Sequence, residues 1–436
     1  MTSTGSSKRP ASPTRSISPP PLKRKVESSI SKKAVSSFFT PASQKKPEKI
    51  SWRVVNNSLV AGKYAKESDR KQAAEKPKVA AFDLDSTLVS TASGNTFPRN
   101  SSDWKWWHTT VPSRLRQLIE DGYYIVIISN QKKVSLQKEI KGGRSDSKSL
   151  TNFKERVIAV MTDLDIPISV YAATQDDKYR KPRIGMWEEF LDEYDFDVTG
   201  IDLTNSIFVG DAAGRPNDHS QVDRGFAVNA RIPFKTPEEF FLDAAPEALV
   251  EAFDPTLYLK SDPIDGVPPL FSRQSPQELV IFCGSPGAGK STFYWSYLEP
   301  LNYERVNQDT LKTRAKCIKV AKEHLAAGKS VAVDNTNADP DVRSYWIEIA
   351  KEFHVPIRCV YFPASQELCR HNNAVRAANQ NLNPESRTLL PGIAFGDFQR
   401  RFKEPTLTEG FKDIIRADFR FRGDDEAKNI WQQYWI

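Results

Sequence analysis

Unbroken runs of apolar residues, each ending in small polar or charged residues, recur in two separate parts of the chain. They predict six strands, at residues 79–82, 123–128, 207–209, 279–282, 330–333 and 357–362. Between the first two strands, apolar residues at helical spacing predict a helix over residues 112–120. Continuously apolar strands that alternate with helices are typical of a buried parallel sheet, because both faces of such a sheet are covered. The pattern therefore predicts α/β structure in both parts.

The chain of 436 residues is long enough for two or three domains. Residues 1–70 are dominated by Ser, Pro and Lys or Arg and show no hydrophobic periodicity, so we expect a disordered basic tail. The first domain is expected over residues 75–252, a linker rich in Pro, Asp and Ser over residues 253–276, and the second domain over residues 277–436. The predicted fold class is α/β, with two three-layer parallel-sheet domains behind the tail.

Positive charge is concentrated at the N-terminus. Residues 1–50 contain eleven Lys or Arg and two acidic residues, whereas the whole chain has a net charge of +7. The rest of the chain therefore carries −2, so a nucleic-acid groove has to be a local basic patch. No apolar run approaches the ~18 residues of a membrane span, and we expect neither a membrane segment nor a secretory signal. The four cysteines form no CxxC pair and are expected to be reduced.

A pair of carboxylates follows the first predicted strand. Asp83 and Asp85 stand where the backbone is rigidly placed. A carboxylate nucleophile can hydrolyse a phosphate ester through an aspartyl intermediate, and Asp83 is the candidate. Asp85 is the candidate acid and base, which protonates the leaving oxygen and then deprotonates water. Because two carboxylates repel a phosphate, a divalent cation such as Mg²⁺ is required, with Asp83, Asp85 and Asp211 as its expected ligands.

Two further residues complete this candidate site. Ser129, at the end of the strand at residues 123–128, would hydrogen-bond a phosphoryl oxygen, and Lys181 would offset the developing charge. Taken singly these residues mean little, since a D-x-D at a strand end is as often a turn or a cap. In this order and spacing, residues 78–245 resemble the haloacid-dehalogenase superfamily. The resemblance implies the nucleophile, acid/base, phosphate, lysine and metal roles given above, and it leaves the substrate open.

A glycine-rich loop follows the fourth predicted strand. It fits the pattern G-x-x-x-x-G-K-[ST] and comprises Gly284, Ser285, Pro286, Gly287, Ala288, Gly289, Lys290, Ser291 and Thr292. Gly287 and Gly289 let backbone N–H groups approach the phosphates of a nucleotide triphosphate, and the following helix N-terminus favours an anion. Lys290 would reach the β- and γ-phosphates, and Ser291 would bind Mg²⁺. The loop therefore predicts a phosphate-donor pocket.

Phosphoryl transfer also needs a group that orients the attacking hydroxyl, and Asp309 is the candidate base. Asp334, at the end of the strand at residues 330–333, suits a metal-side or acceptor-side role and equally well the role of a cap. Arg370 and Arg376 lie on a predicted helix. Because residues six apart do not share a helix face, only one of them should meet the transferred phosphate, and Arg376 is preferred.

Together the two parts resemble the polynucleotide kinase 3′-phosphatase family over about residues 78–415. The matching segments are YRKP at residues 179–182, GMW at 185–187, GDAAGRP at 210–216, PFKTPEEFF at 233–241, VNQDT at 306–310, DNTN at 334–337, RHNN at 370–373 and EPTLTEGF at 404–411. The resemblance implies DNA end healing in strand-break repair. It implies that the first domain removes 3′-phosphates and that the second phosphorylates 5′-hydroxyls with ATP, with Asp309 as kinase base and Arg376 as lid arginine.

The tail suggests a location and a partner for such an enzyme. Basic clusters at residues 8–9 and 23–25 have the separation of a bipartite nuclear localisation signal, which predicts a nuclear protein. A merely soluble basic tail and an acid-poor organellar presequence are the alternatives. Val35, Phe38 and Phe39 place two aromatic rings after a spaced aliphatic residue, which resembles a sliding-clamp-binding peptide. Contact with a sliding clamp or another repair protein through these side chains is the resulting hypothesis.

DNA binding is predicted from two groups of side chains. Around a Gly- and Ser-rich loop lie Lys132, Lys133, Lys138, Lys141 and Arg144, and before the first helix lie Trp104, Trp106 and Trp107. Cations on phosphates and aromatic rings stacked on bases are what single-stranded ends use. A solvated loop and core tryptophans are the alternative.

Departures from the family and competing functions stay open. Animal members begin with a phosphopeptide-binding β-sandwich, which low-complexity residues replace here, and Gln308 stands where an arginine is common. RNA end healing shares the phosphate chemistry, and only the 2′-hydroxyl distinguishes the substrates. A repair scaffold with a vestigial kinase half is the third hypothesis, although intact Lys290, Ser291 and Asp309 argue against it.

Overall fold

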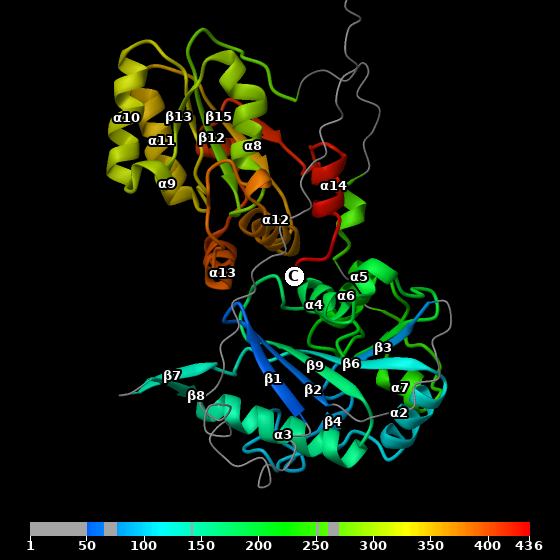
Figure 1. Cartoon of the computed structure of the whole chain (residues 1–436). Coiled ribbons are helices and arrows are strands. Elements are labelled where there is room, and N and C mark those ends of the chain that lie inside the picture. Colours follow the sequence, from blue (N-terminus) through cyan, green and yellow to red (C-terminus); the bar gives the residue numbers. More distant parts are fainter. Residues whose placement is uncertain (1–49, 65–75, 141–142, 250–252, 260–269) are drawn as a thin grey trace, which may run out of the picture.

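The computed structural model describes residues 50–64, 76–140, 143–249, 253–259 and 270–436. Figure 1 shows two α/β lobes, one built mainly from the first half of the chain and the other from the second. Each lobe has a central sheet with helices packed on it, so the predicted fold class of two α/β sheet domains is confirmed. The predicted nuclear signal and clamp-binding peptide lie outside the described residues.

The first lobe is organised by a seven-stranded sheet. Its strands, in spatial order, are β1 (Ile50–Val55), β2 (Leu59–Tyr64), β9 (Ile168–Ala173), β6 (Tyr123–Asn130), β3 (Lys78–Phe82), β10 (Ile207–Val209) and β11 (Phe234–Lys235). The strands from β9 to β11 pair in parallel, whereas β1 and β2 are antiparallel additions at one edge. The lobe also has two small ribbons, β4 (Val89–Ser90) with β5 (Lys105–Trp106) and β7 (Gln137–Ile140) with β8 (Gly143–Asp146).

The hairpin of β1 and β2 corrects the sequence-based boundary of the tail, which was placed at residue 70. Asn56 and Asn57 turn the chain with φ of 48° and 53°, values that Asn tolerates better than most residues. The pairing of β2 with β9 then covers the edge of the parallel sheet. The partner strand lies more than a hundred residues away in sequence, so local composition could not reveal it.

Helices cover both faces of the first sheet. One face packs on α2 (Val111–Glu120), α3 (Lys148–Leu164) and α7 (Pro237–Phe241), and the other packs on α4 (Gly185–Glu193), α5 (Phe196–Thr199) and α6 (Val222–Ala230). The predicted helix over residues 112–120 corresponds to α2, with Pro112 in its first turn, where a missing backbone N–H costs nothing. The alternation of strands and helices therefore gives the three-layer arrangement expected from the sequence.

The second lobe has a five-stranded, fully parallel sheet. Its spatial order is β13 (Glu304–Val306), β14 (Val331–Val333), β12 (Leu279–Gly284), β15 (Ile357–Phe362) and β16 (Ile414–Arg416). The helices are α8 (Lys290–Phe293), α9 (Gln308–Leu311), α10 (Arg314–Ala326), α11 (Pro340–Glu352), α12 (Gln366–Ala378), α13 (Gly392–Arg401) and α14 (Asp425–Trp431). Short 3-10 turns lie at Pro255–Tyr258, Glu299–Leu301, Gln380–Leu382 and Leu407–Glu409, and a π-helical turn lies at Tyr294–Leu298.

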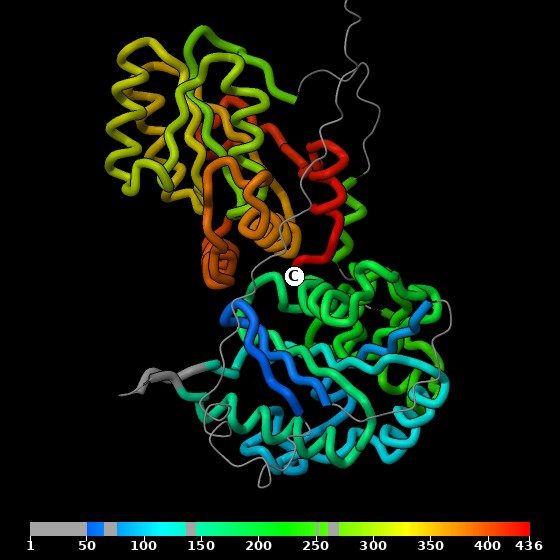
Figure 2. The backbone as a smooth tube through the Cα atoms, in the orientation of Figure 1, coloured from blue at the N-terminus to red at the C-terminus, as the bar shows by residue number. Residues whose placement is uncertain are grey.

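The end of the chain returns from the second lobe to the first. Figure 2 shows the segment after α14 running down to the helices α4 and α6 of the first lobe. Within the described residues, no helix combines the length and apolar character needed to cross a membrane. The four cysteines are buried and free of disulfide bonds, in line with the expected reduced thiols.

Two candidate active sites

Three carboxylates converge at the strand ends of the first sheet. Asp83 follows β3, Asp211 follows β10, and Asp223 lies in the first turn of α6. One oxygen from each of them lies within 4.8 Å of the others, in the group that could hold a metal ion. Hard oxygen ligands at such spacing suit Mg²⁺. The structure thus brings Asp83 and Asp211 together, as the sequence predicts, and adds Asp223.

One lysine faces two of these carboxylates. Nζ of Lys181 lies 2.6 Å from Asp83 Oδ1 and 2.8 Å from Asp223 Oδ1, with all three side chains buried. Burial alone would lower the pKa of Lys181, but Asp223 and Asp83 outweigh it and raise that pKa. Burial raises the pKa of Asp83 well above its usual range, against the opposing effect of Lys181, and it raises the pKa of Asp211 to about 6. Three carboxylates with a single lysine leave an excess of negative charge, which a divalent cation would balance.

The side chain of Asp85 lies outside this carboxylate group, so its predicted role as a metal ligand stays a prediction. Its carboxylate turns instead toward Arg156, whose Nη1 lies 2.6 Å from Oδ1, and toward Gln131, whose Nε2 lies 2.6 Å from Oδ2. The almost fully buried Arg156 draws the carboxylate away, because a buried guanidinium needs a charged partner. The side chain of Asp85 is 43% exposed, an open position that an acid and base for an incoming substrate requires.

Ser129 and its neighbours fix the rest of this site. Ser129 is buried at the end of β6, and Gln131 Nε2 donates to its Oγ over 3.0 Å. Gln131 therefore contacts both Ser129 and Asp85. Asn130 holds the loop that carries Lys181, because its Oδ1 accepts from the Lys181 amide over 2.9 Å and its Nδ2 donates to the Lys181 carbonyl over 3.1 Å. All the residues predicted for the first site thus lie at one edge of the sheet.

The glycine-rich loop of the second lobe joins β12 to α8. Gly287 and Gly289 have φ of +80° and +94°, and a Cβ on Gly287 would lie 2.3 Å from the Cys369 carbonyl oxygen, so only glycine fits there. Lys290 begins α8, and its Nζ lies 3.0 Å from the carbonyl oxygen of Gly284 and 2.7 Å from that of Ser285. Burial lowers the pKa of Lys290. The loop therefore has the geometry of a phosphate-binding P-loop.

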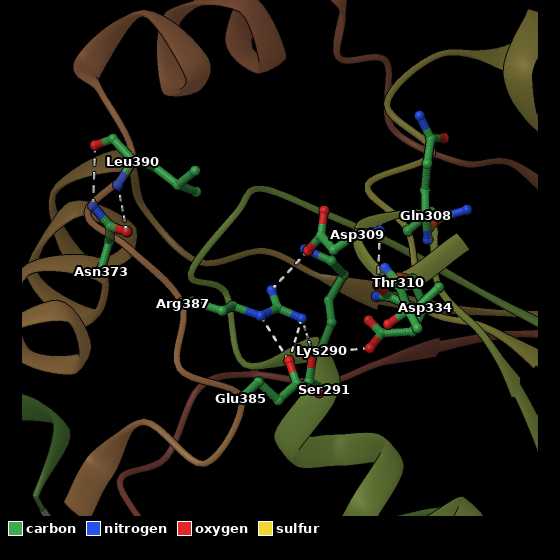
Figure 3. A network of polar contacts seen from close by, with 12 residues as sticks. Lys290, Ser291, Gln308, Asp309, Thr310, Asp334, Asn373, Glu385, Arg387 and Leu390 are labelled. Atoms are coloured by element: carbon green, nitrogen blue, oxygen red, sulfur yellow. Dashed lines mark hydrogen bonds and ion pairs between the residues drawn. The ribbon is translucent and has the colours of Figure 1, made fainter. Parts of the chain in front are cut away.

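A polar network surrounds the end of this loop (Figure 3). Ser291 Oγ donates to Asp334 Oδ2 over 2.8 Å, and Arg305 Nη2 lies 2.5 Å from the same oxygen. Asp334 is buried after β14, and its carboxylate contacts these side chains rather than the backbone of a helix end. The geometry therefore favours a role for Asp334 on the metal side of the site, beside Ser291, over a role as a helix cap.

Arg387, like Arg305, is a residue of this network that sequence reasoning missed. Its Nη1 lies 3.1 Å from Asp309 Oδ2, its Nη2 donates to Ser291 Oγ over 3.3 Å, and its Nε donates to Glu385 Oε2 over 2.6 Å. Asp309 itself lies on α9, where Asn307 caps the helix by accepting from the Asp309 amide over 2.9 Å, and its side chain is 72% exposed. Arg387 belongs to an irregular segment without motif or periodicity, so no sequence signal pointed to it.

The two candidate lid arginines of α12 differ in exposure. Arg370 is exposed, whereas Arg376 is half-buried and its Nη2 donates to Asn373 Oδ1 over 3.2 Å. Burial lowers the pKa of Arg376, and the nearby positive charge of Arg387 lowers it further. Asn373 also holds the backbone of Leu390 with two hydrogen bonds of 3.2 Å, as Figure 3 shows. Arg376 and Arg387 therefore lie close to each other, while Arg370 faces solvent.

Comparison with known proteins agrees with this division into two lobes. A family model described as polynucleotide kinase 3 phosphatase matches residues 78–241, and one described as an AAA domain matches residues 279–405. The bifunctional polynucleotide phosphatase/kinase of Schizosaccharomyces pombe is 42% identical over 386 residues, which cover 88% of this chain and 88% of that protein.

The chain belongs to the bifunctional polynucleotide phosphatase/kinase family.

Other relatives, named as polynucleotide 3′-phosphatases, cover a smaller share of this chain. A polynucleotide 3′-phosphatase of Saccharomyces cerevisiae is 30% identical over 37% of this chain and 87% of that protein. The polynucleotide 3′-phosphatase ZDP of Arabidopsis thaliana is 34% identical over 38% of this chain and 24% of that protein. In this bifunctional polynucleotide phosphatase/kinase, the carboxylate site is therefore the phosphatase site, and the P-loop site is the nucleotide-binding kinase site.

The residues predicted to contact DNA in this family member fall into two groups. Trp104, Trp106 and Trp107 are partly buried against the core of the phosphatase lobe, and Trp106 Nε1 donates to Asp163 over 2.9 Å. This packing agrees with the alternative of core tryptophans, and since all three are only partly buried, their stacking on bases stays a prediction. Lys132 and Lys133 are exposed, and the Lys133 ammonium lies 3.2 Å from the ring centre of Phe97. Lys141, and the side chains of Lys138 and Arg144, are outside what the structure describes.

Proposed function

We propose that this enzyme heals the ends of broken DNA strands, removing 3′-phosphates at the phosphatase site and phosphorylating 5′-hydroxyls with ATP at the kinase site. The observation that carries the proposal is the presence, in one family member, of two separate phosphate-handling sites. One is the cluster of Asp83, Lys181, Asp211 and Asp223, and the other is the P-loop with Asp309 and its arginines. Both ends of a strand break then become substrates for ligation.

At the phosphatase site, Asp83 attacks the phosphorus atom, and the bond between phosphorus and the DNA 3′-oxygen breaks. Asp85 donates a proton to that oxygen, so the 3′-hydroxyl leaves. Asp85 then accepts a proton from water, which attacks the aspartyl phosphate, releases inorganic phosphate and restores Asp83. Lys181 and Ser129 hold the phosphoryl oxygens. Asp83, Asp211 and Asp223 are the residues that would hold Mg²⁺, which supplies positive charge beside the phosphate when bound.

At the kinase site, Asp309 accepts the proton of the 5′-hydroxyl while the hydroxyl oxygen attacks the γ-phosphorus of ATP, and ADP leaves. The P-loop amides and Lys290 bind the phosphates, and Arg376 and Arg387 offset the charge that develops on the transferred group. Ser291 and Asp334 would hold Mg²⁺, which would supply positive charge beside the phosphates. We further propose that the enzyme acts in the nucleus, from the basic clusters of its tail, and that the aromatic pair there contacts a repair protein.

A nicked duplex with a 3′-phosphate and a 5′-hydroxyl, labelled at both termini, tests the proposed function. Incubation without ATP should remove only the 3′-phosphate, and addition of ATP should also phosphorylate the 5′ end. RNA oligonucleotides of the same sequence serve as the matched substrate, because the 2′-hydroxyl then distinguishes the two sugars. Equal or faster turnover of RNA would favour RNA end healing over DNA repair as the function. Absence of the kinase reaction alone would favour the hypothesis of a repair scaffold with a vestigial kinase half.

A further inference from the structure

The last residues of the chain connect the two lobes. α14 ends at Trp431, which packs against Phe419 and Phe421 in the kinase lobe. Three residues later, Tyr434 lies against α6 of the phosphatase lobe, and Figure 2 shows this segment passing between the lobes. Residues 431–434 therefore have one anchor in each lobe.

The anchor in the phosphatase lobe is Asn229, near the end of α6. Its Nδ2 donates to the Tyr434 carbonyl over 2.8 Å and to the Pro182 carbonyl over 2.8 Å, and its Oδ1 accepts from the Tyr434 amide over 2.9 Å. Both amide hydrogens of the side chain are therefore used. Asn229 joins the C-terminal segment to the loop that immediately follows the active-site Lys181.

The same contact reaches the carboxylate cluster through α6. Asp223 lies in the first turn of this helix, and Gly225 follows two residues later. A Cβ on Gly225 would lie 3.1 Å from Tyr434 Cβ and 3.2 Å from Pro182 Cβ, so the three segments are closely packed there. Tyr434 therefore contacts α6, which carries Asp223, and is joined through Asn229 to the segment that carries Lys181.

The anchor in the kinase lobe leads to the P-loop. Trp431 Nε1 donates to Asn372 Oδ1 over 2.8 Å, and Asn372 Nδ2 donates to the Gly287 carbonyl over 2.8 Å. The Trp431 carbonyl oxygen also lies 2.8 Å from Nε2 of the buried His371. The side chain of Asn372 thus links the C-terminal segment to Gly287. Gly287 belongs to the P-loop, whose backbone N–H groups would bind the nucleotide phosphates.

We propose that residues 431–434 couple the two sites, with Asn229 and Tyr434 as positioning residues, so that nucleotide at the P-loop speeds the phosphatase reaction. This inference rests on the proposed function of both sites. Phosphates bound by the P-loop fix Gly287, and the chain of hydrogen bonds through Asn372 and Trp431 restricts Tyr434. Through Asn229, Tyr434 in turn holds the Pro182 segment and α6, and closer positioning of catalytic groups raises a rate without changing the chemistry.

The test measures phosphatase turnover on an oligonucleotide that carries phosphate at both ends, with and without a non-hydrolysable ATP analogue. The 5′-phosphate leaves no acceptor for the kinase. In the wild-type enzyme we expect the analogue to raise the phosphatase kcat about fivefold, with little change in KM. A factor of about five is at the low end of the range that is typical for coupling between two sites. Asn229→Ala, and a truncation that removes residues 433–436, should lower kcat and abolish the response to the analogue, while both keep wild-type kinase activity on a 5′-hydroxyl oligonucleotide.

Asn205→Ala is the matched control, because Asn205 is an exposed asparagine of the same lobe that bonds only to Asp202 among the described contacts. It should respond to the analogue as the wild type does. The truncation touches no residue of the phosphatase lobe, so it distinguishes lost coupling from a misfolded lobe. A wild-type kcat that ignores the analogue, or variants that keep the response, would overturn the coupling. Absence of either activity from the wild-type enzyme would instead refute the proposed function.

Discussion

At the residue scale, the proposed phosphatase mechanism depends on one nucleophile, Asp83. Asp83→Asn removes the attacking carboxylate while keeping the size of the side chain and a contact for Lys181. We expect 3′-phosphate release to fall by several orders of magnitude, as for other covalent nucleophiles, with 5′ phosphorylation unchanged. End-labelled oligonucleotides measure both activities. A phosphorylated protein trapped during turnover should carry the label on Asp83, and a label elsewhere would refute the mechanism.

The crowded carboxylates give the metal site a pH dependence. Burial and the neighbouring Asp223 raise the pKa of Asp211 to about 6. Since the folded-state pKa lies above the unfolded value, the contribution of this group to metal-free stability is lost as the pH rises through about 6. Mg²⁺ needs the ionised carboxylate, so its stabilisation of the lobe should grow over the same range. The rise in melting temperature on addition of Mg²⁺, measured at about pH 5 and about pH 7, should be larger at about pH 7. Asp211→Asn should remove this dependence on pH.

Arg387 is the kinase residue whose role is tested most directly by substitution. Arg387 contacts both Asp309, the proposed base, and Ser291, a proposed Mg²⁺ ligand. Its loss therefore removes positive charge beside both residues. Arg387→Ala should lower the kinase kcat by a factor of about 10² to 10³, as for removal of one charge-stabilising donor. Arg387→Lys should have a kcat between those of the wild type and Arg387→Ala. Arg370→Ala is the control, because Arg370 is exposed. If Arg370→Ala impaired the kinase and Arg387→Ala did not, the assignment would be reversed.

At the element scale, the sequence predicted the strands and the site residues at their ends. Asp83 and Asp334 each follow a buried strand and Ser129 lies at the end of one, and apolar runs define those strands from local sequence alone. Asp223 and Arg387 were not predictable in this way, since one lies in a helix and the other in an irregular segment. Their partners are distant in the chain, and only the packing of α6 and of the segment after α12 brings them to the sites.

The hairpin at the sheet edge gives a prediction at this scale. Removing residues 1–49 should leave the stability of the phosphatase lobe unchanged, whereas removing residues 1–70 deletes β1 and β2 and exposes the edge of β9. Loss of buried side chains such as Val55, Leu59 and Val60 should cost about 5 kcal/mol or more, and lower the melting temperature by about 10 °C or more. Calorimetry of the two truncated proteins tests this. Equal melting temperatures would show that the hairpin is dispensable.

At the scale of the whole molecule, each lobe carries its own chemistry. Lys290→Ala should remove 5′ phosphorylation, because Lys290 is the P-loop cation that we propose binds the transferred phosphate. The basal rate of 3′-phosphate release, measured without nucleotide on the same nicked DNA, should stay at the wild-type value. Far-ultraviolet circular dichroism checks the fold of the variant. Loss of both activities in a folded variant would mean that the two reactions share one site.

The position of Tyr434 has a consequence for how the enzyme matures. Asn229 precedes its partner Tyr434 by 205 residues in the chain. The phosphatase lobe can therefore build its sheet early in synthesis, but it lacks this contact until Tyr434 has left the ribosome. Newly made enzyme should thus acquire its full phosphatase competence only after residues 431–434 have been made, later than the sheet itself is complete.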